Sequence, residues 1–91
     1  MPTITPTPFY RALGNAVRVH RRLATDPRTG HSMPQYVLAD MLGMVASGIS
    51  QIESGQRRPP VELVARIASV LGVDVSALVP AYPIEEHTVN D

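Results

Sequence analysis

Residues 35–55, QYVLADMLGMVASGISQIESG, decide how this chain folds. Apolar side chains recur in it at the three- and four-residue spacing of a helix face, at Leu38, Ala39, Leu42, Ile49 and Ile52. Gly43 interrupts the pattern in the middle, and Gly55 ends it. The stretch therefore predicts two short helices joined by a tight turn. Helices this short bury little surface alone, so they must pack against other helices of the domain. In such an arrangement the second helix can be exposed to a binding partner.

Size and composition limit what that scaffold can be. The chain has 91 residues, 44% of them hydrophobic, which suits one small domain with a modest core. It contains no cysteine, which excludes disulfides, thiolate metal ligands and cysteine nucleophiles. No apolar run approaches the roughly 20 residues of a membrane span, and the N-terminus lacks the pattern of a signal peptide. We therefore expect a soluble, cytoplasmic protein.

The apolar periodicity predicts further helices on both sides of residues 35–55. The expected helices cover residues 9–24, 34–43, 45–54, 60–72 and, as one more short helix, part of 73–79. No segment shows the sustained two-residue alternation of a strand. The expected fold is all-α, with about five short helices.

Composition also divides the chain. Residues 1–8 alternate proline and threonine and are expected to form a flexible arm, and residues 80–91 an acidic, mobile tail. The expected folded domain is therefore 9–79. Residues 25–32 contain Pro27 and Gly30 and predict a loop.

Groups that could support catalysis or bind metal are few. His20, His31 and His87 are far apart, and none has a second ligand three or four residues away. No glycine-rich phosphate loop and no nucleophile turn is present. We expect no enzymatic activity, no metal site and no cofactor.

Charge is unevenly distributed although the formal net charge is zero. Arginines gather in the N-terminal third, at Arg11, Arg18, Arg21, Arg22 and Arg28, whereas Glu85, Glu86 and Asp91 close the chain. A basic half suits a phosphate-bearing partner, and a solvated helix face explains it equally well.

Residues 13–79, apart from one insertion, resemble the Xre family, the lambda-repressor-like helix-turn-helix domains that include phage repressors and Cro proteins. The matching positions are Gln35, Leu38, Ala39, Gly43, Ile49, Ile52, Glu53, Gly55, Arg57, Pro59, Ile67, Ala68, Leu71, Val73 and Leu78, preceded by Leu13, Val17, Arg18 and Arg21. The chain departs from the family in the longer connection at residues 24–33 and at Val45, where a serine or threonine cap is usual. Gly48 inside the third helix costs about 1 kcal/mol relative to alanine, and that helix contains no arginine or lysine.

The resemblance implies that the third helix lies in the major groove of DNA. The residues that it implies at the interface are Gln35, Val45, Ala46, Ser47, Ser50, Gln51, Arg57 and Arg58. Gln51 would bond an adenine, Gln35 a phosphate, and the two arginines the backbone beyond the helix. The family also implies an ion pair between Arg21 and Glu53, with plain surface placement as the alternative.

The expected function is that of a DNA-binding transcriptional regulator, a repressor that binds a palindromic operator as a homodimer. The dimer candidates are Leu78, Val79, Ala81 and Tyr82, although Leu78 also fits the core. One alternative is an antitoxin whose tail or arm folds onto a toxin. Another is a protein-interaction module of the same fold that does not bind DNA.

Overall fold

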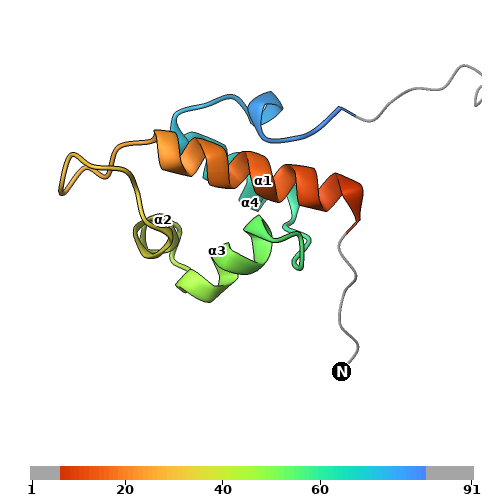
Figure 1. Ribbon diagram of the computed structural model, residues 1–91, viewed down its shortest axis with the longest axis horizontal. Helices are drawn as coiled ribbons and strands as arrows, with labels where there is room; N and C mark the ends of the chain where they lie inside the picture. Colours follow the sequence, from red (N-terminus) through yellow and green to blue (C-terminus); the bar gives the residue numbers. More distant parts are fainter. Residues whose placement is uncertain (1–6, 82–91) are drawn as a thin grey trace, which may run out of the picture.

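The computed structural model describes residues 7–81, and these residues form an all-helical fold (Figure 1). The elements are α1 (Pro8–Leu23), α2 (Gln35–Leu42), α3 (Ala46–Glu53), α4 (Val61–Leu71) and a short 3₁₀ helix, η1 (Val75–Ala77). The all-α expectation is confirmed, and the predicted boundaries agree within about two residues. The expected fifth helix is a single 3₁₀ turn.

α1 begins earlier than its sequence pattern indicated. Thr7 caps it, with the side-chain oxygen accepting from the Tyr10 backbone N–H at 3.3 Å, and Pro8 occupies the first turn. Residues 7 and 8 therefore belong to the start of the helix, not to the arm, and residues 1–6 lie outside the described part of the chain. Leu13 and Val17 are buried along one face of α1.

The connection between α1 and α2 is a small hairpin held by its own hydrogen bonds. Thr25 and Ser32 pair as an isolated antiparallel bridge, and the Asp26 N–H donates to the His31 carbonyl at 2.7 Å. The Asp26 carboxylate is buried and accepts from the Arg28 backbone N–H at 2.9 Å. The insertion is thus an ordered turn.

α2 and α3 meet at Gly43, as the sequence predicted. Gly43 has a φ of +72°, in the left-handed region that glycine adopts without strain. The Met44 N–H then donates to the Ala39 carbonyl at 2.8 Å, which closes the end of α2. α3 starts directly afterwards with Val45 as an extended residue that provides no side-chain cap.

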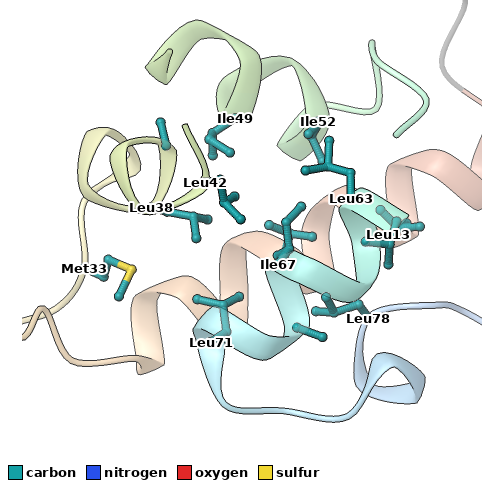
Figure 2. Close-up of a cluster of buried hydrophobic side chains, with 14 of the residues drawn as sticks. Leu13, Met33, Leu38, Leu42, Ile49, Ile52, Leu63, Ile67, Leu71 and Leu78 are labelled. Carbon is teal, nitrogen blue, oxygen red and sulfur yellow. The ribbon is translucent and has the colours of Figure 1, made fainter. Parts of the chain in front are cut away.

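An aliphatic core holds the helices together. Figure 2 shows side chains from α2, α3 and α4, among them Leu42, Ile49 and Ile67, meeting in one cluster. Ile49 and Ile67 are fully buried, and burying such a side chain contributes about 1.5–3 kcal/mol. Figure 1 shows α2 and α3 on one side of α1 and η1 on the other. The core therefore fixes α3 through its inner face and leaves the outer face free.

At Gly14, α1 lies directly against the backbone of α3. A Cβ atom at this position would lie 2.6 Å from the Glu53 carbonyl oxygen and closer still to that of Ile52. Backbone carbonyls cannot move aside as a flexible side chain can, so this crossing requires a residue without a side chain. Between residues 7 and 81, no helix is long and apolar enough to cross a membrane.

Candidate nucleic-acid interface

The outer face of α3 carries three of the eight residues that the sequence assigned to DNA contact. Ser47, Ser50 and Gln51 are exposed, while Ile49 and Ile52 on the opposite face are fully buried. Val45 precedes the helix with 71% of its surface exposed. Ala46, at the start of α3, is half-buried. The face offers hydroxyl, amide and methyl groups and carries no charge of its own.

Glu53 is the charged residue of α3, and it is buried against Arg21 of α1. Arg21 Nε donates to Glu53 Oε2 at 2.6 Å and Nη2 donates to Oε1 at 3.1 Å, a two-pronged pairing. Arg21 Nη1 also donates to the Met33 carbonyl at 2.8 Å. The expected pairing of Arg21 with Glu53 is present, and it ties α1 to the end of α3 and to the hairpin.

Gln35 lies at the first position of α2, where the sequence suggested a phosphate contact. Its side chain takes another partner, because Nε2 donates to Glu53 Oε1 at 2.9 Å. Gln35 therefore extends the Arg21–Glu53 pair and joins the start of α2 to the end of α3. Its amide nitrogen is directed at that buried carboxylate.

Arg57 and Arg58, expected to act together, lie in different surroundings. The Arg57 backbone N–H donates to the Gln51 carbonyl at 3.1 Å, so the chain turns back toward α3 after the helix ends. The Arg58 guanidinium lies 5.4 Å from the centre of the Tyr10 ring, a cation–π distance. Arg57 is thus associated with α3 and Arg58 with the N-terminal end of α1.

The family model HTH_3, described as helix-turn-helix, matches residues 28–78. This chain belongs to that helix-turn-helix family. The match includes α2, the Gly43 turn and α3, and it confirms the Xre resemblance read from the sequence. No curated protein matches the chain.

Solved structures share the helix-turn-helix fold. The clp gene regulator ClgR from C. glutamicum is 24% identical, covers 81% of this chain and 86% of its own, and has a TM-score of 0.64. The S. venezulae BldD DNA-binding domain is 22% identical over 81% of this chain and 100% of its own, also with a TM-score of 0.64. Hydroxypropylphosphonic acid epoxidase from S. wedmorenis is 24% identical over 78% of this chain, with a TM-score of 0.65. This chain spans about a third of that enzyme, 34% of its length.

The proposed dimer residues of this helix-turn-helix chain separate into two groups. Leu78 is 1% exposed and completes the core, so it cannot offer a surface to a partner. Val79 is 37% exposed and Ala81 is exposed, while Tyr82 lies outside the described residues. Val79 lines an apolar groove of about 190 Å³, whose other walls are Phe9, Tyr10, Leu13, Pro59, Val61, Val64 and Val75.

Two contacts around the helix-turn-helix were not anticipated from the sequence. The Arg28 guanidinium lies 5.9 Å from the centre of the exposed Tyr36 ring, which joins the hairpin to α2. Arg66 Nη2 donates to the Leu42 carbonyl at 3.0 Å and so satisfies the end of α2 from α4. Both contacts join separate structural elements. Nothing in the sequence around Arg28 or Arg66 indicates which partner the side chain contacts.

Proposed function

We propose that this chain is a sequence-specific DNA-binding transcriptional regulator that inserts α3 into the major groove. The observation that carries the proposal is the division of α3 into two faces. Its inner face is locked by Ile49, Ile52 and the buried Glu53 carboxylate, and its outer face offers short hydrogen-bonding side chains. A major groove admits one α-helix, and a helix so fixed can present its side chains to base edges in one register.

The chemistry of the outer face suits base recognition. The exposed Gln51 amide can bond bidentately to adenine, and the Ser47 hydroxyl can donate or accept. Val45 and Ala46 offer methyl groups to a thymine. The helix itself has no arginine or lysine, so the phosphate contacts are assigned to arginines outside it, foremost to Arg57. No catalytic role is part of this proposal.

The proposal includes a homodimer that represses from a palindromic operator. The apolar groove supports this part, because Val61, Val75 and Val79 at its edge are 84%, 41% and 37% exposed. An exposed apolar patch of this kind is typical of an association surface. Two copies would place two α3 helices in successive major grooves, about one helical turn apart.

Selection of duplexes from a random-sequence pool tests the proposal directly. We expect enriched duplexes with two related half-sites spaced about 10 base pairs apart. Their affinity should fall steeply with salt concentration, because phosphate contacts release condensed counterions. If no duplex is retained above background at low salt, the chain is not a DNA-binding regulator. Retention without an enriched sequence would contradict base recognition by α3.

A further inference from the structure

Gly48 lies in the first turn of α3, where a glycine is not required by the backbone. The glycines of positive φ in the described residues are Gly30, Gly43, Gly55 and Gly72, and Gly48 is not among them. Its backbone is that of an ordinary helix, in which alanine is much the better residue. The reason for a glycine at this position must therefore lie in what surrounds it.

The Arg57 guanidinium occupies the space that a side chain at Gly48 would need. A Cβ atom on Gly48 would lie 2.9 Å from Arg57 Nη1 and 3.0 Å from the Met44 Cε atom. Cβ atoms in proteins essentially never lie within 3.0 Å of such a neighbour, so a side chain at Gly48 would make the guanidinium shift. Gly48 is buried, with the ends of the Arg57 and Met44 side chains beside it.

The backbone after α3 brings Arg57 to this place. The N–H groups of Gln56 and Arg57 both donate to the Gln51 carbonyl, at 2.9 and 3.1 Å. From there the Arg57 side chain runs back along α3 to the level of Gly48, three residues before Gln51. Residues three apart are neighbours on a helix surface. The cation therefore lies one turn from Gln51, at the border between the buried and the outer face.

The rest of α3 provides no competing cation. The helix has no arginine or lysine, and its carboxylate, Glu53, is already paired with Arg21. Arg58 is held at the Tyr10 ring of α1. Arg21 is buried in its pair with Glu53, whereas Arg57 is exposed and places its guanidinium beside Gly48 of α3.

We propose that Gly48 is a positioning residue: its missing side chain seats the Arg57 guanidinium on α3, where it binds a DNA phosphate at the edge of the groove. This inference rests on the proposed function and explains how a recognition helix without arginine or lysine acquires a cation. Seating the side chain before binding also reduces the rotamer freedom that is lost when DNA is bound.

A double-mutant cycle tests whether Gly48 positions the Arg57 guanidinium. The four proteins are the wild type, Gly48→Ala, Arg57→Ala and the double variant, each titrated with a selected duplex at several salt concentrations. We expect Arg57→Ala to lower the salt slope by about one, and Gly48→Ala to weaken binding about three- to tenfold. In the Arg57→Ala background, Gly48→Ala should change affinity less than about twofold, because no guanidinium remains to be displaced.

Two controls separate this role from a structural one. Gly48→Ala should not lower the melting temperature, because alanine favours the helix and the atoms it meets are the ends of flexible side chains. Arg58→Ala is the matched control, since the same charge is removed from a residue held at Tyr10. In the Arg58→Ala background, Gly48→Ala should keep its full effect.

The outcomes are distinct. If the wild type binds no duplex at low salt, both the proposed function and the positioning role of Gly48 are wrong. If the wild type binds but Gly48→Ala binds equally well, only the positioning role of Gly48 is wrong. It is also wrong if Gly48→Ala causes the same loss with and without Arg57, because the alanine would then act on the DNA or on the helix directly.

Discussion

Removing the Arg21 guanidinium should cost about 3–5 kcal/mol of unfolding free energy. The change is Arg21→Met, which keeps an unbranched stem of similar length and deletes the charge. Arg21 is 7% exposed and Glu53 4%, so the carboxylate left behind cannot be rehydrated without opening the fold. Within the described structure, Gln35 Nε2 at 2.9 Å would remain as a side-chain donor to Glu53.

The magnitude follows from the contacts that are lost. Arg21 makes the 2.6 and 3.1 Å hydrogen bonds to Glu53 and the 2.8 Å bond to the Met33 carbonyl. Breaking a buried pair by removing one partner typically costs about 3–5 kcal/mol, because a buried charge stays uncompensated. Domains of this size have a total stability of only about 5–14 kcal/mol. The melting temperature should therefore fall by about 12–40 °C.

Urea unfolding followed by circular dichroism measures this loss. Arg22→Met is the matched control, since Arg22 is the exposed neighbour of Arg21, and it should change stability by less than about 0.5 kcal/mol. The double variant Arg21→Met/Glu53→Met should be more stable than Arg21→Met alone, because no unpaired charge remains. A cost below about 1 kcal/mol for Arg21→Met, the usual value for exposed pairs, would refute the reasoning.

Three further changes test other parts of the molecule. Gln51→Ala should cost about 1–3 kcal/mol on a selected duplex and relax one base position; equal losses on unrelated duplexes would argue against base recognition. Gly14→Ala should destabilise the fold by about 1–3 kcal/mol in urea unfolding, because its Cβ would overlap the Ile52 carbonyl; unchanged stability would disprove that close approach. Val61→Glu should convert a dimer to a folded monomer in light scattering, and an unchanged mass would exclude the groove as the interface.

The local pattern was sufficient to predict the helices. Apolar spacing and the two glycines that end α2 and α4, Gly43 and Gly72, depend on backbone geometry that each segment carries within itself. For the same reason, helical spacing alone places Ser47 and Gln51 on the outer face of α3, opposite Ile49 and Ile52. The beginning of α1 was missed because Thr7 and Pro8 continue the proline and threonine repeat of the arm.

Partners across the fold could not be predicted from local pattern, and the Arg21–Glu53 pair was expected only from the family resemblance. The hydrogen bond from Gln35 to Glu53, 18 residues away, forms because α2 packs against the end of α3. Leu78 fitted both the dimer surface and the core on its sequence, and the turn after η1 places it in the core. The order of the hairpin depends on Thr25 meeting Ser32, which the composition of a loop does not reveal.

Residues 35–55 by themselves determined that the chain is a helix-turn-helix whose second helix contains no arginine or lysine. The tertiary structure decided where the charge around that helix lies. It buries the Arg21–Glu53 pair that the family resemblance implied, and it returns Arg57 along the helix to Gly48. The physical reason is that periodicity fixes which face a residue occupies, whereas an ion pair or a seated guanidinium requires two distant segments to be brought together by the core.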